Sequence, residues 1–493
     1  MKKVLIVGGG ISGLTAGIYL QEAGFDTEIH EKNAVAGGQC TGWKREGYFI
    51  DNCIHWLTGT KEGSALNCLW HKIGALGDAV KLHEKEFFFS SELGGNRLTF
   101  WRDLERTRTE MLRLSPDDAV EINKLINYTK LAENMTIPVD KPFDEMNILD
   151  FIKLGISMKE MRKLLKAYGG IDTIELGNRF QHPLIQQALV DYMPPGHQAY
   201  AFLVSYATVT SGNGDVPAGG SLAMAMRISK KYQELGGVLC TNSPVKKVLR
   251  KDQKATGLLL SDGKEIAADY VVCACDTDYT YRKLLDKNYM PKSLKKLYEN
   301  RKLYPVTSAF QIAFAVDEKF EELKGTRIFP CEELMIAHSK IHRMSTNYYD
   351  YEEHFAPQGK TVLQTNFIQT EYDFTYWKDL YQSKEDYHRK KQELSAEIMK
   401  RLLTQYPFLQ DKVHVIDIWT PMTYYHYCNS YCGSYMSFIV TKKAKSTIVP
   451  GKMKGIDNLF LASQWQMGPG GLPTAVAMGK FAAYRIKKCE RIK

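Results

Sequence analysis

The sequence is poor in the features that mark exported, membrane-spanning and metal-binding proteins. No stretch approaches the ~18 uninterrupted apolar residues of a transmembrane helix. No leader precedes the apolar run at Val4, so we expect no secretory segment. The ten cysteines are scattered, without a C-x-x-C pair, and Cys428 and Cys432 lack partners at ligand spacing. The sequence therefore predicts no disulfide framework, no metal site and a reducing, cytoplasmic location.

An excess of one charge is also nearly absent. Lysine and arginine exceed aspartate and glutamate by nine, in a chain with 25% charged and 44% hydrophobic residues. These are ordinary values for globular domains. The excess is spread along the chain and accompanies no nucleic-acid motif, so we expect no nucleic-acid partner. The G-x-G-x-x-G spacing of a dinucleotide-binding turn occurs only once, which argues against a separate NAD(P)H domain of the disulfide-reductase type. The electron donor or acceptor and the oligomeric state stay open.

The most informative stretch lies at the N-terminus. Val4 to Val7 is a short apolar run typical of a buried parallel strand. Gly8, Gly10 and Gly13 follow it in the G-x-G-x-x-G spacing of a dinucleotide-binding turn. Gly8 permits a sharp turn, Gly10 leaves room for a pyrophosphate, and Gly13 lets the next helix pack on the strand. The start of that helix offers free N–H groups to phosphate.

An acidic residue and a glycine pair continue the nucleotide pattern. A second predicted strand, Thr27 to His30, ends in Glu31, at the spacing of the carboxylate that accepts ribose hydroxyls. Such a carboxylate repels a 2′-phosphate, so the site favours FAD or NAD over NADP. Gly37-Gly38 then lets the backbone approach a long nucleotide. A second glycine-rich turn, Gly470 to Pro473, opens the last predicted helix.

These elements, with Gly47-Tyr48-x-x-Asp51, resemble FAD-dependent phytoene desaturases and carotenoid isomerase-like enzymes of the amine-oxidase-type flavoprotein superfamily. The resemblance extends to residues 212–278 and 456–485, with Ser463-Gln464 where many relatives have Gly-Asp. It implies an α/β fold: a Rossmann-like FAD-binding domain with an interleaved α+β substrate-binding domain. The first would comprise residues 1–60, 212–278 and 441–493, and the second residues 61–211 and 279–440.

The resemblance also implies a bound FAD and the residues that hold it. The first turn would hold the adenine side, and the closing helix would stabilise the negative charge of a reduced flavin with its N-terminus. The predicted cofactor-binding residues are Gly8, Gly10, Ile11, Ser12, Gly13, Glu31, Lys32, Gly37, Gly38, Gln39, His55, Trp56, Val245, Ala274, Ser463, Gln464, Gly471, Leu472, Pro473 and Ala475.

The implied activity follows from that family. Its members act mainly on lipophilic polyenes, so we expect an FAD-dependent oxidoreductase acting on C–C bonds of an unsaturated, isoprenoid-like substrate, as a desaturase or saturase. One alternative is a flavin-dependent double-bond isomerase or hydratase of polyunsaturated fatty acids. Another is a non-enzymatic prenyl-lipid-binding protein of the same fold, such as the Rab GDP-dissociation inhibitors. The intact glycine turns argue against the latter. An amine oxidase is a further alternative.

No sequence motif identifies the groups that would transfer protons. We take His55, Tyr424 and Tyr425 as catalytic candidates, because imidazole titrates near neutral pH and phenols donate protons. A histidine satisfied inside the core is the competing interpretation of His55, and Asp51 is expected to hold its loop through backbone hydrogen bonds. The tyrosines of the substrate-binding segments suit an aromatic tunnel as well as an ordinary core.

One basic amphipathic stretch, Phe151 to Tyr168, has two interpretations. It predicts either a surface helix packed on a core or a helix that faces a membrane and admits a lipid. The first is the simpler interpretation. The second predicts peripheral membrane contact.

Local patterns predict further elements. Apolar runs predict strands at 238–240, 269–276, 308–316 and 361–369 and after Asn458. Residues 256–260 and 265–267 flank the turn 261–264 and are expected to form a hairpin. Pro116 is expected to start a helix, and residues 377–406 to be mostly helical up to Pro407.

Overall fold

The computed structural model describes residues 1–194 and 196–492, so the last residue of the predicted segment 441–493 lies outside it. In that part of the chain, five parallel strands form one sheet in the order β19-β13-β1-β2-β9. The central strand β1 is buried on both faces, as parallel strands usually are. The strands predicted here are confirmed. They are β1 (Lys3–Val7), β2 (Asp26–His30), β9 (Val238–Cys240), β13 (Tyr270–Cys273) and β19 (Leu459–Leu461).

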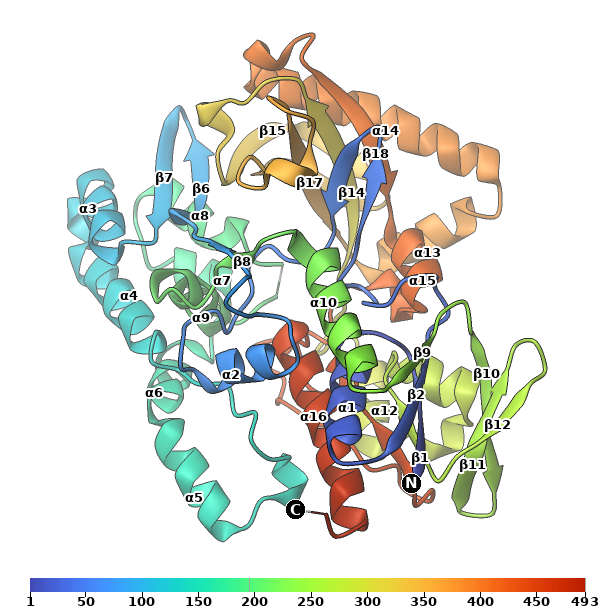
Figure 1. Cartoon of the computed structure of the whole chain (residues 1–493). Coiled ribbons are helices and arrows are strands. Elements are labelled where there is room, and N and C mark those ends of the chain that lie inside the picture. The colour runs from blue at the N-terminus through green and yellow to red at the C-terminus, as the bar shows by residue number, and fades with distance from the viewer. Residues whose placement is uncertain (195, 493) are drawn as a thin grey trace.

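Three helices cover one face of this sheet: α1 (Ile11–Glu22), α10 (Gly220–Glu234) and α16 (Leu472–Cys489). Helix α1 packs against both of the others, and Figure 1 shows it beside α16 and below α10. The packing of α1 on α16 is close, because a Cβ on Gly479 would lie 2.3 Å from the carbonyl oxygen of Ser12. Segments from the beginning, middle and end of the chain therefore share one core.

The opposite face carries an antiparallel three-stranded sheet and α12 (Lys292–Glu299). The sheet consists of β10 (Val245–Lys251), β11 (Lys254–Leu260) and β12 (Glu265–Ala267). Strands β11 and β12 are paired, so the hairpin predicted around the turn at residues 261–264 is confirmed.

The two segments predicted to bind substrate share a second sheet, in the order β18-β14-β17-β16-β15-β6-β7 among the described residues. Strand β6 pairs in parallel with β15, so residues 90 and 91 lie opposite residues 327 and 328. The strands predicted at 308–316 and 361–369 are confirmed. The members are β6 (Phe87–Leu93), β7 (Asn96–Trp101), β14 (Ser308–Val316), β15 (Thr326–Ile336), β16 (Ser339–Tyr348), β17 (Thr361–Gln369) and β18 (Val413–Trp419).

Helices flank both ends of this sheet (Figure 1). The helix predicted to start near Pro116 and the helical region predicted to end before Pro407 are both confirmed. The first insertion contains α2 (Ala65–Lys72), α3 (Leu104–Leu114), α4 (Ala119–Ala132), α7 (Thr173–Gly177), α8 (Pro183–Asp191) and α9 (Ala199–Thr210), and the second contains α13 (Glu371–Leu380), α14 (Lys384–Gln405) and α15 (Pro421–Cys428).

The basic stretch expected to form one amphipathic helix forms two, α5 (Ile148–Ser157) and α6 (Lys159–Tyr168), which meet at Met158. Only α6 packs on a core, where it buries Leu164 and Tyr168. Helix α5 buries none of its residues. The expectation of a helix packed on a core is therefore correct for α6 and wrong for α5.

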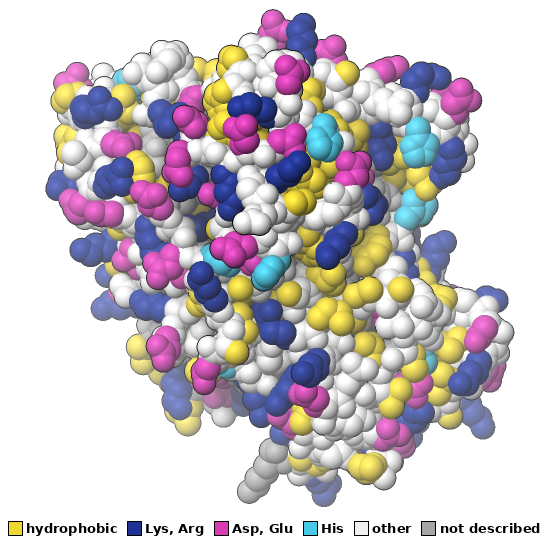
Figure 2. Space-filling view, turned by 45° about the horizontal axis from the view of Figure 1, so that its top comes forward, with side chains coloured by type: hydrophobic (Ala, Val, Ile, Leu, Met, Phe, Trp, Pro, Cys, Tyr) yellow, Lys and Arg dark blue, Asp and Glu magenta, His cyan; other side chains and the backbone are white. Residues whose placement is uncertain are grey.

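The surface is mixed in charge. Figure 2 shows basic and acidic side chains interspersed over the face in view, in keeping with the spread of charge along the sequence. Among the described residues, no helix combines the length and apolar character needed to cross a bilayer.

Candidate cofactor cleft

A long cleft begins at the carboxyl end of β1 and runs to the start of α16. It encloses about 1100 Å³ of empty volume, including its open mouth. Gly8 and Gly10 line one part of it, and Gly471 and Leu472 line another. The N-termini of α1 and α16 both border the cleft, and helix N-termini favour anionic ligands.

The three glycines of the first turn meet different demands. Gly8 adopts φ +99°, a conformation that other residues rarely take. A Cβ on Gly13 would lie 2.0 Å from the carbonyl oxygen of Gly8, so helix and strand touch there, as predicted. A Cβ on Gly10 would meet no protein atom nearer than 4.0 Å, and Gly10 has an ordinary φ of −71°. The protein itself therefore does not require glycine at position 10, whereas a ligand in the cleft would.

Glu31 borders the cleft at the end of β2 and is anchored by the backbone. Its Oε2 accepts a hydrogen bond from Gly9 N at 2.8 Å, and its Oε1 accepts one from Asn33 N at 2.8 Å. Each oxygen keeps a second lone pair that a ribose hydroxyl can use. The carboxylate is thereby held rigidly at the wall of the cleft.

At the other part of the cleft, two amide side chains connect separate loops. Gln464 Oε1 accepts a hydrogen bond from Gly471 N at 2.7 Å, and its Nε2 donates to Gln39 Oε1 at 3.3 Å. Gln39 in turn donates to the carbonyl oxygen of Ser434 at 2.8 Å. This network fixes the turn before α16 against the Gly37-Gly38 loop, so the amide at position 464 positions the loop.

A known protein family matches the sequence of this chain. The profile described as flavin containing amine oxidoreductase matches residues 11–487, almost the whole chain. The chain belongs to this family. The resemblance to the flavoprotein superfamily is thus confirmed, and so are an FAD cofactor and an FAD-dependent oxidoreductase activity.

Known relatives span the full length of this flavin-containing oxidoreductase. The 4,4'-diaponeurosporene oxygenase of Staphylococcus haemolyticus (strain JCSC1435) is 24% identical over 531 residues, covering 99% of this chain and 98% of the relative. The enzyme of that name from Staphylococcus aureus (strain MW2) is 21% identical over 533 residues, covering 99% of each chain.

Solved structures share the fold. An oxidoreductase from Methanosarcina mazei has a TM-score of 0.61 at 17% identity, covering 98% of this chain and 100% of that one. Cyclohexylamine oxidase from Brevibacterium oxydans IH-35A has a TM-score of 0.58 at 13% identity, covering 99% of each chain. The predicted α/β class is therefore confirmed.

The cleft of this oxidoreductase suits FAD. It extends from the N-terminus of α1 to the N-terminus of α16. It is also lined by Gly10, where a Cβ would meet no protein atom nearer than 4.0 Å. The structure brings most of the predicted cofactor residues to its wall: Gly8, Gly10, Ile11, Ser12, Glu31, Lys32, Gly37, Gly38, Gln39, Val245, Ala274, Ser463, Gln464, Gly471, Leu472 and Ala475.

Four predicted cofactor residues do not line the cleft. Gly13 and Pro473 lie in the first turns of α1 and α16, beside residues that line the cleft. His55 lines a separate chamber, and Trp56 packs against Phe88 and Tyr192 in the first insertion. The segment that carries His55 and Trp56 leaves the cleft after Cys53, so these two residues lie outside its lining.

Several residues of the cleft were not predicted. Tyr427, Asn429 and Tyr435 reach it from the segment around α15, within the second insertion. Lys32 Nζ binds that segment, with the carbonyl oxygen of His426 at 2.5 Å. Sequence offered one signal, the aromatic density around Thr420-Pro421. Four cysteines also border the cleft: Cys40, Cys53, Cys275 and Cys428.

Asp276, another unpredicted residue of the cleft, is a buried acid whose oxygens accept hydrogen bonds from Tyr431 N at 2.8 Å and Asp278 N at 2.7 Å. Burial raises its pKa to about 7. This carboxyl therefore titrates near neutral pH at the wall of the cleft.

The catalytic candidates lie in three different places. Burial, with a smaller contribution from the charge of Lys85, lowers the pKa of His55 to about 4, so its imidazole is neutral at pH 7. Tyr424 is buried and donates to Asn52 Oδ1 at 3.0 Å, and burial raises its pKa well above the usual value. Tyr425 is 38% exposed and packs against Phe374, away from the cleft. The structure does not bring the three together.

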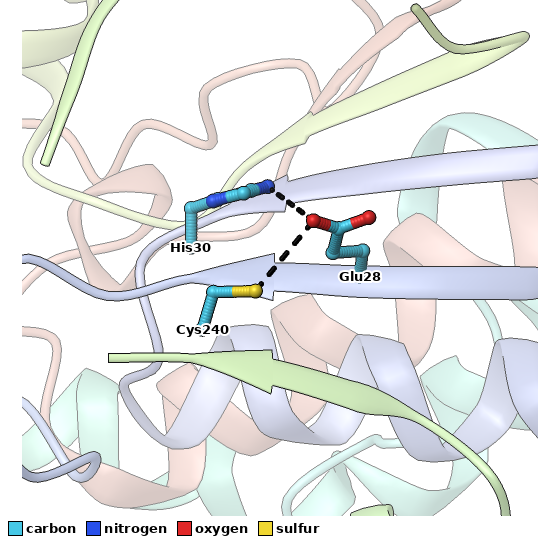
Figure 3. Close-up of side chains that lie close together, drawn as sticks. All are labelled: Glu28, His30 and Cys240. Carbon is cyan, nitrogen blue, oxygen red and sulfur yellow. Dashed lines mark hydrogen bonds and ion pairs between the residues drawn. The ribbon is translucent and has the colours of Figure 1, made fainter. Parts of the chain in front are cut away.

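A polar cluster that sequence analysis did not mark lies on β2 and β9 (Figure 3). Glu28 Oε1 is 3.1 Å from His30 Nε2 and 3.5 Å from Cys240 Sγ, a set that could hold a metal ion. Lys3 Nζ already lies 2.9 Å from Glu28 Oε2, and Ser243 Oγ lies 2.8 Å from His30 Nδ1. Because the Lys3 charge opposes a second cation, we assign the cluster a structural role.

Proposed function

We propose that this oxidoreductase exchanges a hydride with a C–C bond of a lipophilic, unsaturated, polyene-type substrate, as a desaturase or saturase. Bound FAD accepts or donates that hydride at N5. The names of the full-length relatives, oxygenases of 4,4'-diaponeurosporene, support a carotenoid-like substrate. The cleft residues would hold FAD, and residues 1–60, 212–278 and 441–493 would form its domain.

The observation that carries the proposal is an aromatic region between the cleft and the second sheet. Tyr435 lines the cleft, and its ring lies 6.4 Å from that of Tyr424. Tyr349 belongs to the same apolar cluster as Tyr424 and Tyr435, and its ring is 5.9 Å from that of Tyr351. Such a wall contacts an apolar chain over a large area and offers no exposed charge.

The experiment is product analysis with and without an electron acceptor. Purified FAD-loaded protein is given a partly saturated polyene, and double bonds are counted by mass spectrometry and absorbance. Turnover that requires the acceptor supports desaturation. Double-bond movement at unchanged mass without an acceptor would instead identify an isomerase, and oxidation of primary amines alone would identify an amine oxidase.

We also propose that α5 and α6 contact an anionic bilayer from which the substrate enters. Helix α5 exposes a set of apolar side chains, with Ile148 79% and Ile156 70% exposed. Basic residues lie beside them. Helices that lie in a membrane interface have this composition, because their apolar side chains insert into the bilayer and their lysines and arginines face the lipid headgroups. The apolar members are Ile148, Leu149, Phe151, Ile152, Ile156 and Leu165, and the basic members are Lys153, Lys159, Arg162, Lys163 and Lys166.

Vesicle flotation tests this contact. The double variant Lys163→Glu, Lys166→Glu is expected to lose binding to vesicles rich in phosphatidylserine. The double variant Lys246→Glu, Lys247→Glu, which changes two exposed lysines of β10, is the matched control and is expected to bind as wild type does. Equal flotation of all three proteins would refute the contact.

A further inference from the structure

A second chamber lies beyond the cofactor cleft, between the ends of β15 and β16 and the segment that joins β5 (Leu82–His83) to β6. It encloses about 910 Å³ of empty volume, including its mouth. Its wall combines apolar and aromatic residues with polar and charged ones. The apolar and aromatic members are Ile54, Phe87, Val216, Tyr348, Tyr349 and Tyr351.

The chamber adjoins the cleft along the chain and through the tyrosines. Cys53 lines the cleft, and the next two residues, Ile54 and His55, line the chamber. The aromatic region described above lies between the two spaces, since Tyr435 lines the cleft, Tyr349 lines the chamber, and both belong to one apolar cluster with Tyr424. A long apolar molecule that occupied both spaces would pass these tyrosines.

Lys85 supplies the chamber with a cation that has no side-chain partner among the described residues. Lys85 is half-buried. The charge of Asp215 acts on it, but the Asp215 carboxylate accepts a hydrogen bond from Arg102 at 2.8 Å. Glu352 lies 3.2 Å from His83 Nε2 and accepts a hydrogen bond from Gly219 N at 2.7 Å. The half-buried Lys85 ammonium can therefore donate hydrogen bonds to an anionic ligand in the chamber.

We propose that the chamber binds the carboxylate end of the substrate, with Lys85 as its counter-charge. The inference rests on the proposed function and makes it narrower, because it specifies a long apolar carboxylic acid such as a polyunsaturated acid. The carboxylate would sit in the chamber while the unsaturated chain follows the tyrosines toward the flavin. An ammonium–carboxylate hydrogen bond that is partly shielded from solvent is stronger than one in water.

The remaining ionisable groups fit this assignment. Burial lowers the pKa of the Lys85 ammonium to about 8, which leaves it charged at pH 7. His55 is neutral and adds no competing charge. Glu84 and Glu86 are largely exposed, 76% and 71%, and face Arg102 and Arg106. The other charged or titratable groups of the wall are His83, Lys324 and Asp350.

The probe is cis-parinaric acid, a conjugated fatty acid whose fluorescence rises on binding, compared with parinaryl alcohol on the FAD-loaded protein. Wild type is expected to bind the acid about tenfold more tightly than the alcohol well below pH 8. The preference should fade well above pH 8, as the Lys85 ammonium loses its proton. This comparison needs no variant, so it holds even if a substitution disturbs folding.

Variants locate the effect. Lys85→Met is expected to abolish the preference, and Lys85→Arg to retain it. Lys324→Met is the matched control at the same chamber, because Lys324 already pairs with Glu321 at 2.7 Å, and it should behave as wild type does. Equal binding of acid and alcohol by wild type, or a preference that survives Lys85→Met, overturns the inference. Flavin reduction by a polyene hydrocarbon would then still stand as evidence for the proposed function.

Discussion

At the scale of single residues, two glycines of the same motif separate folding from ligand binding. Gly13 is needed by the protein, since its Cα faces the Gly8 carbonyl oxygen across the helix–strand contact. Gly10 has a conformation open to any residue and no protein atom in the way of a Cβ. The motif is thus part structural and part functional.

Exchanging each glycine for alanine should show the difference. Gly13→Ala is expected to destabilise the apoprotein by ~3 kcal/mol or more, because helix and strand must move apart. Gly10→Ala should cost ~0.5–1 kcal/mol, the price of alanine at a helix N-cap, yet weaken FAD at least tenfold. Urea unfolding of apoprotein and a fluorescence titration with FAD measure the two effects. Normal FAD affinity in Gly10→Ala would contradict the position of the pyrophosphate.

Asp51 predicts a pH dependence of stability. Burial raises its pKa to about 7, and its Oδ2 has no hydrogen-bond partner among the described residues, while Oδ1 accepts from Ser221 N at 3.1 Å. Because the folded-state pKa lies above the unfolded value near 3.8, the folded state holds the proton more tightly. Stability attributable to this group is therefore lost as pH rises from about 4 to about 7, by ~4 kcal/mol.

Asp51→Asn removes that loss. The variant should be more stable than wild type at pH 8 and near wild type at pH 4, in thermal unfolding at both pH values. Asp269→Asn is the control, and its effect on stability should have the opposite sign. The Lys3 N–H and Lys2 lower the pKa of Asp269, so its ionised form stabilises the folded protein. A stability gain for Asp51→Asn that does not change with pH would show that this carboxyl is ionised in the folded protein.

At the scale of elements, an arginine joins the two insertions. Arg343 on β16 donates to the Asp191 carboxylate of α8, to Ser91 Oγ at 2.9 Å, and to the Glu92 carbonyl oxygen at 2.7 Å, both on β6. The Asp191 side chain is only 1% exposed. The contact therefore fixes β6 and α8 to the sheet of the second insertion.

Replacing Arg343 alone should lower the free energy of unfolding far more than replacing both Arg343 and Asp191. Arg343→Leu leaves a buried carboxylate unpaired and is expected to cost ~3–5 kcal/mol in chemical unfolding, whereas Arg343→Leu with Asp191→Leu should recover most of that loss. Arg97→Leu, which breaks a more exposed ion pair with Glu92, should cost less than ~1 kcal/mol. A small effect of Arg343→Leu alone would show that the contacts of Arg343 with Asp191 and β6 do not hold the insertions together.

Local elements could be predicted wherever a short pattern determines them. The strand at Val4, the hairpin after Thr256 and the helix after Pro116 follow from apolar runs, turn residues and a helix start. The pairing of β6 with β15 could not be predicted, because the paired residues lie more than 200 positions apart and carry no local signal. The break at Met158 likewise depends on how α6 packs.

At the scale of the whole molecule, the cleft was predictable from its two glycine-rich ends and not from its middle. The two ends are turns whose backbone geometry requires glycine, so the spacing of the glycines in the sequence predicts them. The middle is built by residues around α15, where Asn429 and Cys432 adopt left-handed conformations that bring the chain back over the cleft. The chamber of Lys85 depends on strand packing between the insertions, which sequence does not record.

Redox catalysis in this molecule requires that substrate and flavin exchange electrons. The direct measurement is the visible flavin spectrum after anaerobic mixing of FAD-loaded protein with a partly saturated polyene, and of reduced protein with its desaturated counterpart. We expect one of the two mixtures to change the flavin band, in step with an equal amount of C–C bond converted. An unchanged flavin band in both mixtures, with or without movement of double bonds, would contradict it.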